Sequence, residues 1–380
     1  MSIVCIHHVW RLAVCLFGEP VFFTGKYKPD KTYTLYIQSL TCRFELKENK
    51  IPTIQVKHNP YFIGNEYLTS SKNAEGGFVT LVLTNIDLKL FFEQYNVYDV
   101  TYNGGWAFRE INGLFNDYID KWIKRKNEAT ISGNKGQRTL AKLMLNSLYG
   151  KFATSLEARS KMPYLGDDGI IHYETLEKEE KNGLYIPVGC FITSYAREKT
   201  IRTSQAIKDY SIKKYGKDLY IYSDTDSIHT LLPIEELKQF CEIDDVELGK
   251  WKHEGSFIKA KFIRQKCYIE KLTKPVPKNK GKRKYKIINY KIACKIYKYG
   301  EVKITCAGMP SSCYKYVTWE KFKTGFSCGG KLVFKHVKGG VKLVETDFTI
   351  KDEKLFPMIK GFWYNTFERR CYHVFNYWNN

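Results

Sequence analysis

Hydrophobic and polar positions follow two different periods in the first half of the chain. Between residues 20 and 113, short hydrophobic runs are separated by turn-forming residues, a pattern that predicts strands. Between 118 and 148, hydrophobic residues recur at helical spacing in two stretches, divided by the polar, glycine-containing break 127–136. The second stretch ends at Gly150. We therefore expect a β-rich region followed by two antiparallel helices.

The second half begins with another polar segment of strands and turns, 153–187. Residues 190–209 have the pattern of one helix, which we expect to follow a strand-like approach. The β-branched and aromatic run 219–222 leads directly into Ser223-Asp224-Thr225-Asp226, and hydrophobic residues resume soon afterwards. This arrangement predicts a β-hairpin with acidic residues at its turn. From residue 262 onward the chain is β-rich and basic.

The composition excludes a disordered chain and favours a polyanionic partner. Of the 380 residues, 43% are hydrophobic and 15% are aromatic, which is too many for wholesale disorder. Lys and Arg number 61 against 40 Asp and Glu, a net charge of +21. Such a surplus favours binding to nucleic acid, because neutralised phosphates release counterions. The alternative is that the lysine-rich composition reflects an AT-rich genome.

The 11 cysteines are scattered and never form a CxxC pair. A structural zinc site is therefore not expected, and the pattern is typical of reduced thiols inside a cell. No uninterrupted apolar stretch between 27 and 360 is long enough to cross a bilayer. The apolar run in residues 1–17 is broken by His7, His8 and Arg11, so we expect no signal peptide and no membrane partner.

Asp224 and Asp226 are the first candidates for chemistry. One residue separates them at a tight turn, and residues i and i+2 of a strand point to the same side. Paired carboxylates suit Mg²⁺, which takes oxygen ligands and completes its shell with water and substrate phosphates. The alternative is an ordinary polar hairpin turn, since Asp and Ser favour turns.

One face of the second predicted helix is another candidate. Arg138, Lys142, Asn146 and Tyr149 occupy positions i, i+4, i+8 and i+11, which share a face of a helix. The two cations could hold a triphosphate, and the ring could support a sugar or base. The alternative is a basic helix face exposed to solvent.

The sequences KLMLNSLYG (142–150) and YSDTDSIH (222–229) closely resemble motifs B and C of family B DNA polymerases. Within that family, the chain is most similar to the protein-primed, phi29-like group. Further segments that resemble motifs of this group are TSYAR at 193–197, FIRQKCY at 262–268, AGM at 307–309, DFTIK at 347–351, GEPVFFTGKY at 18–27 and IPTIQVK at 51–57. The resemblance spans about 18–351, and the joint order of the motifs makes it highly specific.

The resemblance implies a role for each matched residue. Asp224 and Asp226 would be catalytic and would hold two metal ions, Mg²⁺ or its substitute Mn²⁺, at the primer 3′-OH, the α-phosphate and the leaving pyrophosphate. Asp226 would be the more direct ligand, with Asp224 in support. The residues implied to bind substrates are Lys142 and Arg138 for the incoming triphosphate, Asn146 and Tyr149 for the nucleotide and nascent base pair, Thr193 and Arg197 for the template, and Lys266 and Tyr268 for the primer end.

The resemblance also implies an α+β fold with the palm, fingers and thumb of a DNA polymerase, an antiparallel palm sheet and two inserts specific to the group. The inserts and the thumb would form a ring around DNA. The implied segments are an atypical amino-terminal segment (1–17), a first insert (18–113), helical fingers (114–152), a second insert (153–187), the palm (188–306), the thumb (307–351) and a carboxy-terminal extension (352–380).

The amino-terminal segment departs from the family pattern. Motif A should precede Gly18 and supply a third carboxylate, but residues 1–17 contain no Asp or Glu. The acids of the family's exonuclease domain are also missing. Back-translation of the first residues with free codon choice, shifted by one base, yields DVNSMYPS, the sequence expected for motif A. Our hypothesis is that residues 1–17 are translated out of frame, and the alternative is a natural alternative amino terminus.

Two further segments have open interpretations. The aromatic-rich extension 352–380 could stack on bases, or could be a read-through peptide without a selected role. The basic run 271–300 could bind duplex phosphates, or could be a solvated hairpin.

We expect this chain to be a DNA-directed DNA polymerase fragment that catalyses templated nucleotidyl transfer for a phage or mobile-element genome in the cytoplasm of the host cell. The implied partners are template-primer DNA, dNTPs and a terminal protein that serves as primer. The alternative is a non-catalytic DNA-binding remnant that lacks the motif A aspartate. A reverse transcriptase is a poorer match, because YSDTDS lacks the adjacent pair of acids of that class.

Overall fold

The computed structural model describes residues 2–5, 15–55, 67–154, 157–167, 171–180, 185–244, 249–264, 266–272, 302–337 and 340–351. The chain folds into two compact units, one formed by Met1–Ala153 with Tyr185–Gly255 and the other by Thr154–Leu184 with Ser256–Leu355. The extension 352–380 and most of the basic run, 273–300, lie outside the described residues, so their proposed roles stay open.

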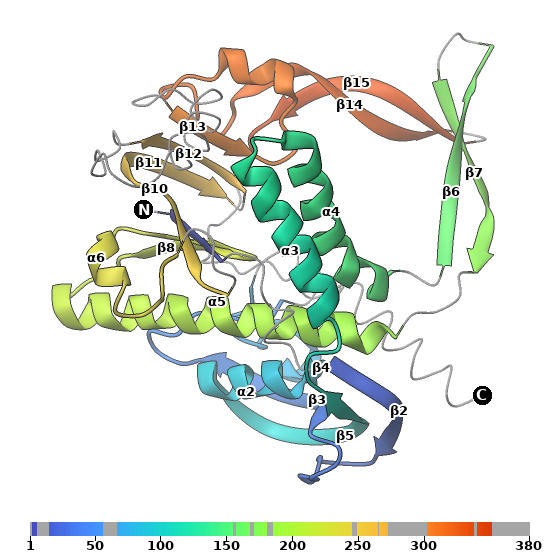
Figure 1. Ribbon diagram of the computed structural model, residues 1–380, viewed down its shortest axis with the longest axis vertical. Coiled ribbons are helices and arrows are strands. Elements are labelled where there is room, and N and C mark those ends of the chain that lie inside the picture. Colours follow the sequence, from blue (N-terminus) through green and yellow to red (C-terminus); the bar gives the residue numbers. More distant parts are fainter. Residues whose placement is uncertain are drawn as a thin grey trace. The chain divides into compact units, whose positions relative to one another are not determined.

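A four-stranded antiparallel sheet in the first unit carries the acidic hairpin (Figure 1). Strands β8 (Tyr220–Asp224) and β9 (Ser227–Thr230) form that hairpin, which confirms the prediction. The sheet continues with β1 (Ser2–Cys5) and β10 (Trp251–Gly255), in the order β10-β1-β9-β8. The amino-terminal segment, which lacks the expected motif, therefore still supplies an inner strand of this sheet.

Helix α5 (Ile186–Tyr215) lies between this sheet and the sheet of the first insert (Figure 1). Near its end, Ile207 packs against Tyr220 of the hairpin. Near its start, Phe191 packs against Phe108 of the first insert. The helix therefore connects the acidic hairpin to the segment 18–113, and the short helix α6 (Ile234–Leu237) follows the hairpin.

The predicted strand-like approach to this helix is wrong, because α5 begins before residue 190. Pro187 is favourable in the first turn of a helix, where no backbone donor is needed, and Val188 is buried there. The helix ends at Gly216, whose φ of 66° is the left-handed conformation common at helix ends. Neither α5 nor any other helix in the described part of the chain is both long and apolar enough to cross a membrane.

A second four-stranded antiparallel sheet, in the order β2-β5-β3-β4, lies within residues 15–111, which overlap the predicted first insert (18–113). Its elements are β2 (Cys15–Phe23), β3 (Leu35–Leu46), the 3-10 helix η1 (Glu75–Gly77), β4 (Val79–Thr84), α2 (Asn85–Gln94) and β5 (Tyr95–Ile111). Phe44 and Tyr95 are buried in its core. The strand pattern does not reveal α2, although Thr84 accepts a hydrogen bond from the Asp87 N–H and caps the helix.

Helices α3 (Asn116–Ile131) and α4 (Lys135–Phe152) confirm the two predicted helices. The break between them is shorter than expected, and α4 continues past the predicted end at Gly150. The two additional residues are stabilised because the ring of Phe152 packs on Phe115, with centroids 5.4 Å apart.

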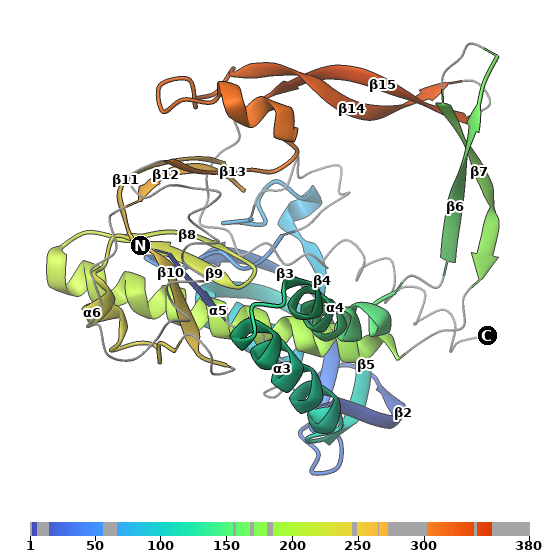
Figure 2. The same ribbon diagram turned by 45° about the horizontal axis from the view of Figure 1, so that its top comes forward.

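The second unit is β-rich, as predicted. Strands β6 (Glu157–Leu165) and β7 (Ile171–Glu180) form a hairpin, and β14 (Ser327–Val337) and β15 (Gly340–Thr349) join it in a sheet of order β14-β15-β7-β6 (Figure 2). Strands β11 (Phe257–Arg264), β12 (Cys267–Leu272) and β13 (Val302–Cys306) form another sheet, and the 3-10 helix η2 (Ser311–Tyr316) follows it.

One pair of cysteines in the second unit corrects the expectation of reduced thiols. Cys313 of η2 and Cys328 of β14 form a disulfide, with Cα atoms 5.9 Å apart. The expectation is wrong for this pair, because the fold places two cysteines that are 15 residues apart in sequence close enough in space to form a disulfide. Elsewhere in the described part of the chain, Cys42, Cys241, Cys267 and Cys306 are buried.

Candidate functional site

The turn between β8 and β9 holds the two predicted carboxylates. Thr225 and Asp226 form its two-residue loop, and the Asp226 N–H donates to the Asp224 carbonyl at 2.7 Å. Thr225 has φ of +56°, a left-handed conformation that β-branched residues rarely adopt. The Thr225 hydroxyl donates to Asp224 Oδ1 at 3.1 Å, and the Ser227 hydroxyl donates to the Asp224 carbonyl at 3.0 Å. The turn therefore fixes both the backbone and the side chain of Asp224.

Asp226 lies where its negative charge is unfavourable. The pKa of its carboxyl is raised to about 6, first by burial and then by the charges of Asp224 and Glu254, against the lowering effect of Lys142. Glu254 belongs to β10 and Lys142 belongs to α4. The acidic turn and the cationic face of α4 therefore lie within electrostatic reach of each other.

Lys126 lies within electrostatic reach of Arg138, Lys142 and Lys252, and these four residues are here named the cation cluster. Lys142 is the member that also acts on Asp226 of the acidic turn. The pKa of Lys126, on α3, is lowered to about 8 by burial first and then by Arg138, Lys252 and Lys142. Burial and Arg138 also lower the pKa of Lys252, against the raising effect of Glu254. Because these like charges repel, a polyanion such as a triphosphate would relieve their repulsion.

Sequence reasoning missed three members of this site, namely Lys126, Lys252 and Glu254. Lys252 and Glu254 alternate along β10, so they share one face of the strand. That spacing was a weak local signal, because many exposed strands carry charges in this way. Lys126 had no local signal at all, since only the packing of α3 against α4 brings it near Arg138 and Lys142.

The four residues of the predicted helix face are all on α4. Arg138 and Lys142 are exposed members of the cation cluster, and Asn146 is half-buried further along. Tyr149 belongs to the same helix, and its side chain lies outside the described part of the structure. The structure thus places Lys142 within electrostatic reach of Asp226, and Arg138 within reach of Lys126 and Lys252. The roles of Asn146 and Tyr149 stay predictions.

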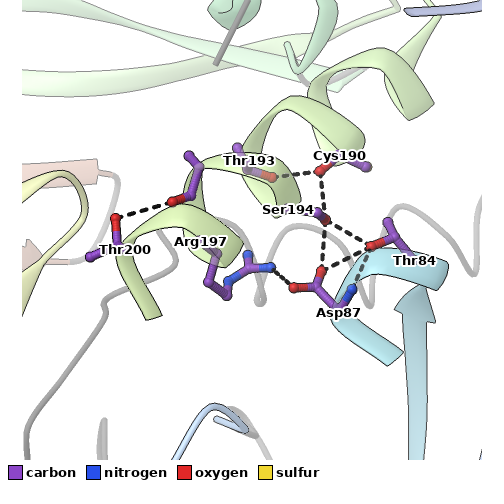
Figure 3. Close-up of polar contacts among 8 residues, drawn as sticks. Thr84, Asp87, Cys190, Thr193, Ser194, Arg197 and Thr200 are labelled. Atoms are coloured by element: carbon purple, nitrogen blue, oxygen red, sulfur yellow. Dashed lines mark hydrogen bonds and ion pairs between the residues drawn. The ribbon is translucent and has the colours of Figure 1, made fainter. Parts of the chain in front are cut away.

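Arg197 lies in a buried polar cluster on the side of α5 that meets the first insert (Figure 3). Its guanidinium forms an ion pair with Asp87 of α2. The Ser194 and Thr84 hydroxyls donate to Asp87 Oδ2 at 2.7 Å and 3.1 Å. The Thr193 hydroxyl donates to the Cys190 carbonyl within α5. Arg197 therefore joins α5 to the first insert, and its predicted contact with the template stays a prediction.

Lys266 and Tyr268 belong to the second unit. Lys266 has φ of +51° just before β12, and its carbonyl accepts a hydrogen bond from the Ala307 N–H at 2.8 Å. The ring of Tyr268 stacks on Phe262 of β11, with centroids 5.2 Å apart. This pairing fixes the local geometry of the predicted primer-binding motif, and its contact with a primer remains a prediction.

Asp224 and Asp226 offer the oxygen donors that hard divalent cations prefer. Within the described ranges, no group of three or more His, Cys, Asp or Glu side chains is placed to hold a metal ion. The pKa of Asp226 is raised first by burial and then by the charges of Asp224 and Glu254, and a bound divalent cation would offset this unfavourable negative charge. The two carboxylates therefore fit a metal that takes its remaining ligands from water and substrate phosphates.

Comparison with known proteins identifies related sequences. A family model described as DNA polymerase type B, organellar and viral, matches residues 16–238. The DNA polymerase of Bacillus phage Nf is 45% identical over 338 residues, which cover 88% of this chain and 54% of the phage protein. The DNA polymerase of Streptococcus phage Cp-1 is 34% identical over 340 residues, with 88% and 53% covered. This chain spans about half the length of the curated relatives it matches.

Solved structures show the same fold. Phi29 DNA polymerase in a ternary complex with primer-template DNA and incoming nucleotides aligns with a TM-score of 0.75 and 39% identity, over 92% of this chain and 57% of that polymerase. This likeness confirms the predicted α+β polymerase fold. Together with the family match and the phage relatives, it shows that the chain belongs to the type B DNA polymerases of organelles and viruses and resembles their protein-primed, phi29-like group.

Proposed function

We propose that this chain is a DNA-directed DNA polymerase, which transfers nucleotides from dNTPs to a primer 3′-OH. The observation that carries the proposal is the electrostatic interaction of Asp226 with Lys142, which joins the acidic turn to the cation cluster. Acids that hold divalent metal and cations that hold a triphosphate are the two parts that nucleotidyl transfer requires. Membership of the polymerase family supports the same reaction.

In this proposal, the cations of the site bind the triphosphate and the acids hold the metal. Lys126, Arg138 and Lys142 would bind the triphosphate oxygens and orient the α-phosphate toward the acidic turn. Asp224 and Asp226 would hold divalent metal, Mg²⁺ or its substitute Mn²⁺, which supplies activation of the 3′-OH and neutralisation of the leaving pyrophosphate. The burial that raises the pKa of Asp226 also strengthens these charge interactions, because little water screens them.

The other predicted roles belong to the same proposal. Asn146 and Tyr149 would line the nucleotide and the nascent base pair, and Thr193 would contact the template. Lys266 and Tyr268 would hold the primer end. The last predicted template ligand, Arg197, would reach DNA only by leaving its buried ion pair with the first insert.

The proposed partners are template-primer DNA and dNTPs. Their support is that phi29 DNA polymerase, the structural neighbour, forms a complex with primer-template DNA and incoming nucleotides. A terminal protein would serve as primer, in line with the protein-primed group. Replication would take place in the cytoplasm of a phage-infected or element-bearing cell. The division into inserts, fingers, palm and thumb is part of this proposal.

A non-catalytic DNA-binding remnant is the second candidate. In its favour, the described residues offer two neighbouring carboxylates but no metal-binding group of three, and residues 1–17 contain no Asp or Glu. Such a protein would bind DNA through its net charge of +21 without adding nucleotides.

Primer extension with Mg²⁺ separates the two candidates. We expect the chain to extend a primer on a template, and Asp226→Ala to reduce the rate by more than about a hundredfold, the scale expected when a positioned charged group is lost. Asp226→Ala should leave DNA affinity nearly unchanged, because the cation cluster remains. Asp218→Asn is the matched control, since Asp218 precedes the same hairpin but pairs with Lys208 at 3.2 Å.

Each possible result has a clear meaning. DNA binding without extension by the unchanged chain would favour the non-catalytic remnant. Equal loss of DNA binding and extension in Asp226→Ala would contradict the assigned role of Asp226.

A further inference from the structure

Helix α5 approaches the acidic hairpin with two hydroxyl side chains, one helical turn apart. The Thr200 hydroxyl is buried and lies 3.0 Å from the Thr225 carbonyl, to which it donates. The Ser204 hydroxyl lies 2.9 Å from the Ser223 hydroxyl, which also accepts a hydrogen bond from Tyr220 at 2.8 Å. These contacts attach α5 to the residue before Asp224 and to the residue before Asp226.

The Thr225 carbonyl is an unusual place for such an attachment. Thr225 is in the left-handed region at φ +56°, where glycine is the usual residue of a two-residue hairpin loop. A β-branched residue in this region is strained, and such strain persists only where the surroundings hold it. The Thr200 hydroxyl is one of those restraints, because it fixes the direction of the Thr225 carbonyl.

The restrained carbonyl belongs to the peptide group that also contains the Asp226 N–H. That N–H donates to the Asp224 carbonyl at 2.7 Å, so the plane of this peptide connects the two acids. Because a peptide group is planar, a hydrogen bond to its oxygen also fixes its nitrogen and the following Cα. The direction in which the Asp226 side chain leaves the backbone therefore depends on the contact made by Thr200.

We propose that Thr200 is a positioning residue for Asp226, with Ser204 as a second anchor of the same hairpin. This inference rests on the proposed function, since it concerns the metal-binding geometry of the acidic turn. Thr200 would not touch metal or nucleotide. Its hydroxyl would hold the turn in the conformation in which the two acids can bind one divalent cation, while the cation cluster, on other elements, is left unchanged.

A purely local role for Thr200 is the competing explanation. Its hydroxyl also lies 3.1 Å from the Ala196 carbonyl, the contact that threonine commonly makes within a helix. A hydroxyl has one proton, so the two acceptors share it. If the helical contact were the important one, loss of the hydroxyl would change the stability of α5 and leave the acidic turn as it is.

The test compares Thr200→Val, which keeps the shape but removes the hydroxyl, with Thr200→Ser, which restores the hydroxyl. The matched control is Thr203→Val, because Thr203 is buried on the same helix and its hydroxyl makes no hydrogen bond to the described hairpin residues. Three quantities are measured in the full chain: deuterium uptake of segment 220–230 without metal, binding of Mn²⁺ alone by electron paramagnetic resonance, and kcat and KM for dNTP in primer extension.

We expect Thr200→Val to increase deuterium uptake in segment 220–230. Mn²⁺ affinity and kcat should each fall by about tenfold, the scale of one lost hydrogen bond. KM for dNTP should change by less than about twofold, because a change confined to the metal site leaves triphosphate binding intact. Thr200→Ser should restore all three properties, and Thr203→Val should resemble the unchanged chain.

Two results would overturn the proposal: unchanged Mn²⁺ binding and deuterium uptake in Thr200→Val, or equal impairment of Thr200→Val and Thr200→Ser. Ser204→Ala provides a second variant if Thr200→Val does not fold, since Ser223 keeps its hydrogen bond with Tyr220. It should produce smaller changes in the same directions, and normal Mn²⁺ binding would again contradict the proposal. Absence of primer extension in the unchanged chain would refute the proposed function, while the Mn²⁺ and deuterium measurements would still test Thr200.

Discussion

At Asp226, burial and the neighbouring acids both disfavour the ionised carboxylate. The carboxyl is placed next to Asp224 and within reach of Glu254, and its pKa is raised to about 6 by burial first and by these acids second. The same features give the turn a strong attraction for cations. A residue whose charge destabilises the fold is what is expected at a binding site, where affinity for a ligand has been selected over stability.

The free energy of unfolding should depend on pH, because the ionised form of Asp226 is unfavourable in the folded state. The pKa of Asp226 is about 6 in the folded state, above the 3.8 usual for aspartate, so the folded state holds the proton more tightly. As pH rises from about 4 to 7, the unfolded state loses its proton first and folding becomes less favourable. Asp226→Asn, which removes the charge, should therefore stabilise the chain above pH 7 by about 2–3 kcal/mol and have little effect below pH 4.

Chemical denaturation with a chelator present, at acidic and at mildly alkaline pH, measures this difference. Asp218→Asn is the control, because Asp218 forms an ion pair with Lys208 and its removal should not stabilise the fold at either pH. An Asp226→Asn variant that is less stable than the unchanged chain at alkaline pH would contradict the expectation.

At the scale of the elements, helix α5 connects the acidic hairpin to helix α2. It packs against the acidic hairpin through Ile207, and its Arg197 pairs with Asp87 of α2. Both charges of that pair are buried. Such a pair adds little net stability, but the loss of one partner leaves an unpaired buried charge and is strongly destabilising. The Thr84 and Ser194 hydroxyls both donate hydrogen bonds to the other carboxylate oxygen, Asp87 Oδ2.

Removing one partner of this ion pair should therefore lower the free energy of unfolding much more than replacing both partners with apolar residues. Asp87→Ala leaves a buried guanidinium without its carboxylate and should destabilise the chain by about 3–5 kcal/mol. The double variant Asp87→Leu with Arg197→Met should lose less than Asp87→Ala, because no buried charge remains unpaired. Chemical denaturation of Asp87→Leu alone, Arg197→Met alone and the double variant completes a double-mutant cycle, and additive losses from the two positions would show that the pair is not coupled.

For the whole molecule, net charge is the property from which we predict how the proposed DNA partner would bind. The net charge of +21 predicts that affinity for duplex DNA is dominated by counterion release. We expect the affinity to fall by about a thousandfold to a hundred-thousandfold between roughly 50 and 200 mM salt, if about six to ten phosphates are contacted. A filter-binding titration at several salt concentrations measures the slope, and a nearly flat dependence would show that the positive surplus does not contact phosphates.

The fold could be predicted wherever local chemistry determines it. Strand alternation followed by Ser223-Asp224-Thr225-Asp226 specified the hairpin, and helical spacing specified α3 and α4. Prediction failed at helix α2, because a capped helix of ten residues was hidden between two strands of the first insert. It also failed for the disulfide, because nothing near Cys313 in the sequence indicates Cys328 as its partner.

The sequence by itself determined the chemical types at the site. They are two acids separated by one residue, Asp224 and Asp226, and two cations one helical turn apart, Arg138 and Lys142. Only the tertiary structure decided which side chains share that site. Lys126, Lys252 and Glu254 come from separate segments and meet there through packing, and Arg197 finds its buried partner 110 residues away. The physical reason is that periodicity reports how a residue relates to its own helix or strand, whereas charge interactions and burial depend on distances that only the complete fold fixes.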